Sequence, residues 1–126
     1  MAILVKIGLC ELAVAGLFGW LIVIRLERPA WLTRAGVESP RRVMQAHLDF
    51  VTMGLILVAV GVAVPGLSTW IAAALAFGAL VNPSLFLPLA FDEAMAKRLP
   101  YRTITLLSFV AMSGSLVAVA ITALGR

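Results

Sequence analysis

Apolar positions dominate four long stretches of the chain, and short polar stretches separate them. The apolar stretches cover about residues 3–24, 43–64, 67–89 and 103–124. Each is long enough to cross a hydrocarbon core of about 30 Å as an α-helix, which rises about 1.5 Å per residue. The pattern therefore predicts an all-α fold, an integral membrane four-helix bundle, with residues 1–126 forming a single membrane domain.

Prolines and glycines mark the connections between these stretches. Pro29 and Ser39-Pro40 interrupt the first polar connection, and Pro65-Gly66 ends the second span. Because only residues 65–68 are left for a turn, the second and third spans should pack antiparallel as a hairpin. Small residues four apart, such as Ala74 and Gly78, favour close helix packing without choosing between a bundle and an oligomer.

The basic residues are distributed unevenly along the chain. The connections between spans one and two and between spans three and four carry eight of the ten Lys and Arg residues. Short loops rich in Lys and Arg stay on the cytoplasmic side. We therefore expect both loops to be cytoplasmic and both termini to be outside, in a multi-pass protein of the inner (plasma) membrane.

Composition excludes several classes of protein. Hydrophobic residues make up 63% of the chain and the mean hydropathy is +1.09, more apolar than a small water-soluble core requires. The net charge of +4 does not indicate nucleic-acid binding, because the basic residues flank apolar segments. Cys10 is the only cysteine, so an intramolecular disulfide is impossible.

His47, the only histidine, lies near the start of the second span. A buried histidine either hydrogen-bonds between helices or serves as a ligand. A zinc or non-haem iron centre needs more ligands than the chain's histidine content offers, whereas an axial haem ligand needs only one. Asn82, followed by Pro83, has two similar interpretations. It either bonds to exposed backbone or a neighbouring helix, or lines a cavity together with His47 at similar depth.

Three charged residues complete the candidate set. Glu11 in the first span either pairs with Lys6 or takes part in a proton relay, and we expect it to lie in the outer half, remote from His47. Arg41 and Arg42 precede the second span. They either anchor the topology or hold a carboxylate such as a haem propionate.

The second span resembles a helix of a known family. Residues 41–54 contain an arginine, the pair Ala46-His47, Asp49 two positions later and Gly54 seven positions later. This pattern is similar to the second helix of hydroxylaminobenzene mutase and the related styrene oxide isomerase. The third span resembles the Gly-x-x-x-Asn helix of the same family through Gly78, Asn82 and Phe86. The resemblance covers about half of the chain.

The resemblance implies a homotrimer of four-helix bundles with haem b between protomers. His47 would be the axial ligand to the haem iron, and the open position of ferric iron would act as a Lewis acid on the oxygen of a small apolar substrate from the bilayer. The reaction would be an isomerisation without net redox change. Met53, Asn82 and Phe86 match the positions of the family's substrate pocket.

Two of these positions depart from the family. Met53 stands where the family has an asparagine, and Phe86 stands where the isomerase has a tyrosine, so each loses a polar contact to substrate. The haem ligand is better preserved than the substrate contacts. The alternative function is a non-catalytic subunit of a larger membrane complex, in which His47, Asn82 and Glu11 are only satisfied polar contacts. A solute transporter is less well supported, because four short helices leave little room for a pathway.

Overall fold

The computed structural model describes residues 2–126, and this part of the chain is helical without a β-strand. Four segments are long and apolar enough to span a membrane: Ala2–Glu27, Pro40–Ala63, Thr69–Phe91 and Leu99–Leu124. The predicted all-α four-helix bundle is therefore confirmed, and the protein is a multi-pass membrane protein. The elements are α1 (Ala2–Glu27), α2 (Pro29–Arg34), α3 (Pro40–Ala63), α4 (Thr69–Ser84), α5 (Phe86–Phe91), η1 (Glu93–Lys97) and α6 (Leu99–Leu124).

The helices begin and end within a few residues of the apolar stretches from which we predicted them. α3 and α6 start earlier than expected because a proline in the first helical turn loses no hydrogen bond there. The third span is divided at Leu85 into α4 and α5. Pro83 and Pro88 lie on either side of this division, and neither has a backbone N–H to continue the helical hydrogen-bond ladder.

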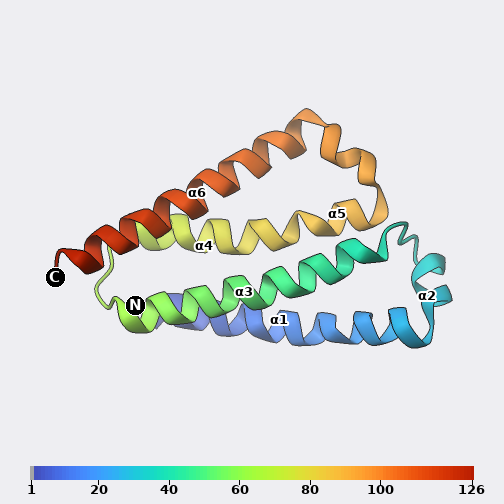
Figure 1. The fold of residues 1–126 in the computed structure, drawn as a ribbon, viewed down its shortest axis with the longest axis horizontal. Helices are drawn as coiled ribbons and strands as arrows, with labels where there is room; N and C mark the ends of the chain where they lie inside the picture. Colours follow the sequence, from blue (N-terminus) through green and yellow to red (C-terminus); the bar gives the residue numbers. More distant parts are fainter. Residues whose placement is uncertain (1) are drawn as a thin grey trace.

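The helices run up and down, with both termini at one end and the α1–α3 and α5–α6 connections at the other (Figure 1). α3 packs against α1 and α4, and α6 packs against α4. Figure 1 also shows that α6 diverges from α5 and α3 toward the connection end. The orientation with the termini outside stays a prediction from the Lys and Arg distribution.

Two helix pairs approach closely because glycine removes a side chain from the contact. A Cβ added at Gly8 would lie 2.7 Å from the carbonyl oxygen of Gly54, so the backbones of α1 and α3 touch. A Cβ added at Gly78 would lie 2.8 Å from the Cβ of Met112, which brings α4 equally close to α6. Small residues at such contacts are the usual way in which helices pack in lipid, where van der Waals packing replaces the hydrophobic driving force.

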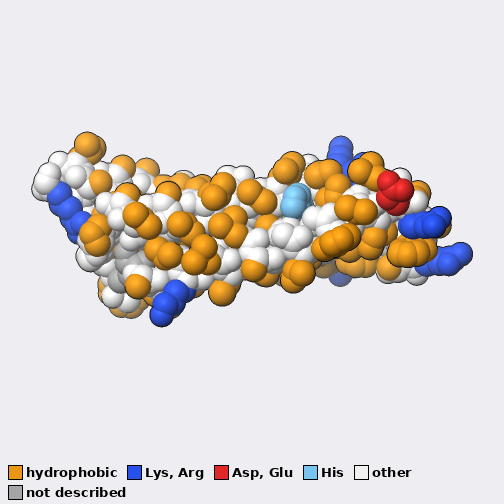
Figure 2. Space-filling view, turned by 90° about the horizontal axis from the view of Figure 1, so that it is seen from below, with side chains coloured by type: hydrophobic (Ala, Val, Ile, Leu, Met, Phe, Trp, Pro, Cys, Tyr) orange, Lys and Arg blue, Asp and Glu red, His pale blue; other side chains and the backbone are white. Residues whose placement is uncertain are grey.

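The outer surface is apolar along the length of the molecule. Figure 2 shows hydrophobic side chains between two ends that carry the Lys and Arg residues. Large apolar side chains are exposed on several helices, among them Trp20, Trp70 and Val117. In a membrane these faces contact lipid.

The connection end is held together between α3 and α5. The backbone N–H groups of Glu38 and Ser39 donate to the carbonyl oxygen of Ala90, at 2.8 and 2.9 Å. Arg42 Nε donates to Glu93 Oε1 at 3.1 Å. Hydrogen bonds from Ser39 and from Arg42 lower the pKa of the exposed Glu93 carboxyl below its usual value. α5 is therefore fixed to the start of α3, while α6 leaves this group and opens a cleft.

Alanine substitutions at glycines separate close packing from general helix effects. We expect Gly8→Ala and Gly78→Ala each to lower the free energy of unfolding by about 1–3 kcal/mol, because the added methyl overpacks a helix contact. Gly16→Ala and Gly114→Ala are matched controls, since no heavy atom lies within 4 Å of either added Cβ. Thermal unfolding in mild detergent measures the difference. Equal stability of all four variants would contradict the two close contacts.

Candidate functional site

A cleft of about 320 Å³ lies between α3, the α4–α5 junction and α6. α3 contributes Asp49 and Met53, α4 contributes Asn82, and α5 contributes Phe86. The structure thus brings together the three residues for which the sequence predicts a substrate pocket. α6 closes the cleft with Tyr101, Thr105 and Phe109.

Asn82 is held in the cleft by a bond to α6. The hydroxyl of Ser108, which is fully buried, donates to Asn82 Oδ1. Asn82 is 8% exposed, and no other hydrogen bond of its amide is found within residues 2–126. The side chain therefore makes the predicted contact with a neighbouring helix and keeps its amide N–H donors for a molecule in the cleft.

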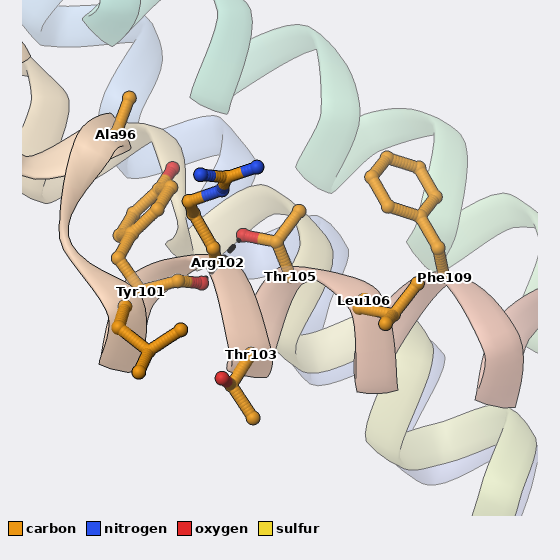
Figure 3. Close-up of a pocket in the computed structure, with 8 residues that line it drawn as sticks. Ala96, Tyr101, Arg102, Thr103, Thr105, Leu106 and Phe109 are labelled. Carbon is orange, nitrogen blue, oxygen red and sulfur yellow. Dashed lines mark hydrogen bonds between the residues drawn. The ribbon is translucent and has the colours of Figure 1, made fainter.

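The other neutral polar groups of the cleft are bonded within the protein. Tyr101 donates its hydroxyl hydrogen to the carbonyl oxygen of Leu85 at 2.7 Å. Leu85 lies at the break between α4 and α5, so this bond ties the start of α6 to that break. Thr105 Oγ1 donates to the carbonyl of Tyr101 at 2.8 Å. Figure 3 shows Tyr101 and Thr105 extending to the same side of α6 as Phe109.

His47 lies on the other side of α3, against α1. Its Nδ1 is 2.8 Å from the carbonyl oxygen of Ala15. Because a carbonyl oxygen can only accept, Nδ1 carries a hydrogen, and in the neutral imidazole Nε2 then keeps its lone pair. The imidazole is half-buried and is visible on the face of the molecule shown in Figure 2. Beside it, Gly19 of α1 leaves the ring uncovered, since an added Cβ there would lie 3.7 Å from Cε1.

The sequence interpretation that His47 and Asn82 line one cavity is wrong for a single chain. His47 faces α1, whereas Asp49 and Met53 of the same helix face the cleft next to α6. At about 100° per residue, Met53 is about 120° round the helix from His47. The hairpin of α3 and α4 therefore carries two separate polar sites.

Arg41 and Arg42 form ion pairs at the connection end. Glu93 Oε1 lies 3.1 Å from Arg42 Nε and 3.9 Å from Arg41 Nη2. Arg42 also donates from Nη1 to Gln45 Oε1 at 2.9 Å. These bonds join the start of α3 to η1 and direct both arginines to Glu93 instead of His47.

Glu11 is a buried residue of α1, with 2% of its surface exposed. Neither carboxylate oxygen has a hydrogen-bond partner within residues 2–126, and the predicted ion pair with Lys6 is not among the salt bridges of this part of the chain. Glu11 is one helical turn from Ala15, which holds His47, so the two are not remote as expected.

Sequence reasoning missed the contribution of α6. Tyr101, Thr105, Ser108 and Met112 are spaced four, three and four residues apart, which places them on one helical face. The signal was available as three hydroxyl-bearing residues, Tyr101, Thr105 and Ser108, on one face of the span. It was hidden because the span was expected to begin at residue 103, which left Tyr101 in a loop.

The bond between Ser108 and Asn82 can be tested by removing the hydroxyl. We expect Ser108→Ala to lower the free energy of unfolding by about 1–3 kcal/mol, because Asn82 Oδ1 is then left buried without its donor. Ser113→Ala is the control, since the exposed Ser113 hydroxyl bonds only to Phe109 in its own helix. Thermal unfolding in detergent gives the comparison, and equal midpoints for the two variants would contradict the assigned bond.

Comparisons with known proteins identify no family for this chain. No protein-family model, curated protein or solved structure matches the chain. The function is therefore argued from the two sites on α3: the cleft lined by Met53, Asn82 and Phe86, and the imidazole of His47.

Proposed function

We propose that the protein binds haem b through His47 and rearranges a small apolar oxygenated substrate, as an isomerase or mutase of the plasma membrane. The observation that carries the proposal is the bond from His47 Nδ1 to the Ala15 carbonyl. Such a bond fixes the tautomer and ring orientation of a metal-binding histidine and makes Nε2 more basic. The resemblance of residues 41–54 to haem-dependent isomerases points in the same direction.

The residues around His47 fit a haem. Gly16 and Gly19 lie on α1 beside Ala15, and neither carries a side chain that would cover the imidazole. An added Cβ at Gly16 meets nothing within 4 Å, so a flat macrocycle has open space on this face. Arg41 and Arg42, the residues expected to hold a propionate, are paired with Glu93 in this chain.

The cleft has the chemistry to hold the substrate. Met53, Phe86 and Phe109 provide apolar walls that exclude water. The Asn82 amide can donate a hydrogen bond to a substrate oxygen, and the Ser108 bond keeps that amide in place. When bound, a ferric haem would supply a Lewis acid for the same oxygen.

The two sites need two copies of the chain to meet. His47 lies on the α1 side of α3, and the cleft lies on the α6 side. An assembly in which His47 of one copy faces the cleft of the next would complete the site. A cyclic homotrimer of this kind is what the family resemblance implies, and heterologous contacts that close into a ring produce it.

The second candidate function is a non-catalytic membrane subunit. The bonds from His47 to Ala15 and from Ser108 to Asn82 support it, because they give each of the two polar side chains a partner within the chain. This alternative predicts a colourless preparation that carries partner proteins.

An absorption spectrum distinguishes the two functions. We expect the protein, produced with added haem precursor and purified in mild detergent, to show a Soret band that His47→Ala removes, because Nε2 is the proposed ligand. Asn82→Ala is the matched variant. It should keep the band and lose turnover of phenylhydroxylamine or styrene oxide, because it lies in the cleft and not at the iron. A wild-type protein without the band, or a band that survives His47→Ala unchanged, would contradict haem binding at His47.

A further inference from the structure

The cleft continues outward along α6 into a wider region of about 720 Å³. Tyr101, Thr105 and Phe109 line both regions. The outer region adds Arg102 and Leu106, and its residues belong to η1 and the first half of α6, which begins at the connection end of the bundle. We call it the outer cleft.

The outer cleft is lined by one charged side chain, that of Arg102. The Tyr101 hydroxyl and the Thr105 hydroxyl are both bonded to backbone carbonyls. Arg102 has no ion pair or side-chain hydrogen bond among residues 2–126, in contrast to Arg41 and Arg42, which share Glu93. Figure 3 shows the Arg102 side chain on the same side of α6 as Tyr101, and Thr103, which also lines the region, on the other side.

An apolar track leads away from this charge. Leu106 and Phe109 follow Arg102 by four and seven residues, so the three lie on one helical face. Leu106 is 65% exposed and Phe109 is 59% exposed. Since α6 runs from the connection end toward the C-terminus, the track descends from the membrane boundary into the hydrocarbon region.

We propose that the outer cleft binds an anionic phospholipid, with its phosphate on Arg102 and an acyl chain along Leu106 and Phe109. A planar guanidinium matches a phosphate with two parallel hydrogen bonds. Arg102 lies about one turn inside α6, at the depth where lipid headgroups meet the helix. The bound acyl chain contacts Phe109, so it forms part of the wall of the cleft that Met53, Asn82 and Phe86 line.

The charge at this end favours a lipid over a second copy of the chain. The two connections carry eight of the ten basic residues against four acidic ones, Glu27, Glu38, Asp92 and Glu93. An anionic leaflet attracts such a surface, and each Lys or Arg near it adds to the attraction. The site requires no haem, so its test is independent of the proposed function.

Native mass spectrometry of the full chain in mild detergent tests the proposal, with phosphatidylglycerol and phosphatidylcholine as probes. We expect phosphatidylglycerol to be retained over phosphatidylcholine, and Arg102→Gln to lower its retention about fivefold. Arg34→Gln is the control, because it removes the same charge at the same end from the exposed residue of α2. Equal losses in the two variants would overturn the site in favour of general attraction to the basic end.

A second pair of variants tests the acyl track without changing charge. Leu106→Trp should block the track and lower retention, whereas Leu107→Trp, also exposed but outside the outer cleft, should not. No effect of Leu106→Trp would overturn the proposal, as would displacement of the lipid by an equal concentration of inorganic phosphate. If Arg102→Gln instead dissociates an oligomer that carries no lipid, a second copy occupies the surface and the proposal is wrong.

Discussion

Two close helix contacts position both candidate sites. Gly8 and Gly54 bring α1 and α3 together, and His47 reaches the Ala15 carbonyl seven residues, about two turns, from these glycines on each helix. Gly78 and Met112 bring α4 against α6, and Asn82 meets Ser108 one turn away on each helix. A hydrogen bond between helices requires the two helices to lie this close together. In lipid, no water is present to hydrogen-bond to the polar groups instead.

α3 carries a different kind of site on each side. Toward α1 it presents an imidazole with a fixed tautomer at an open surface. Toward α6 it presents Asp49 and Met53 to a cleft whose far wall is formed by α6. The cleft exists because the bonds at Ala90 and Glu93 hold α5 on α3 while α6 diverges. A ligand on one side of α3 therefore meets a ligand on the other only across two chains.

The sequence predicted the helices better than it predicted their faces. The four spans followed from length and hydropathy, because a membrane admits little else. Met53, Asn82 and Phe86 were predicted to share a pocket, and they line one cleft. The shared cavity of His47 and Asn82 was wrong, and so was the distance of Glu11 from His47. Both errors concern the direction in which a side chain faces around the axis of its helix. A hydrophobic pattern does not determine that rotation when nearly every position is apolar.

The close contacts were equally hard to recognise in advance. Gly78 belonged to a pair of small residues that the sequence indicated. Gly8 and Gly54 lie on different helices, and the sequence does not show that these two glycines face each other. Two other glycines, Gly16 and Gly114, have open space where a side chain would lie. The residue that each glycine contacts depends on which helices pack side by side. That arrangement is known only from the three-dimensional structure.

A mixed assembly tests most directly whether the two sides of α3 meet between copies. Chains with His47→Ala and chains with Asn82→Ala, carrying different tags, would be produced together and isolated through both tags. Their rearrangement of phenylhydroxylamine and styrene oxide would then be measured. If His47 of one copy faces the cleft of the next, mixed assemblies regain part of the wild-type activity that neither variant has alone, because some interfaces join an intact histidine to an intact cleft. Mixed assemblies as inactive as each variant, beside an active wild type, would contradict a site shared between copies.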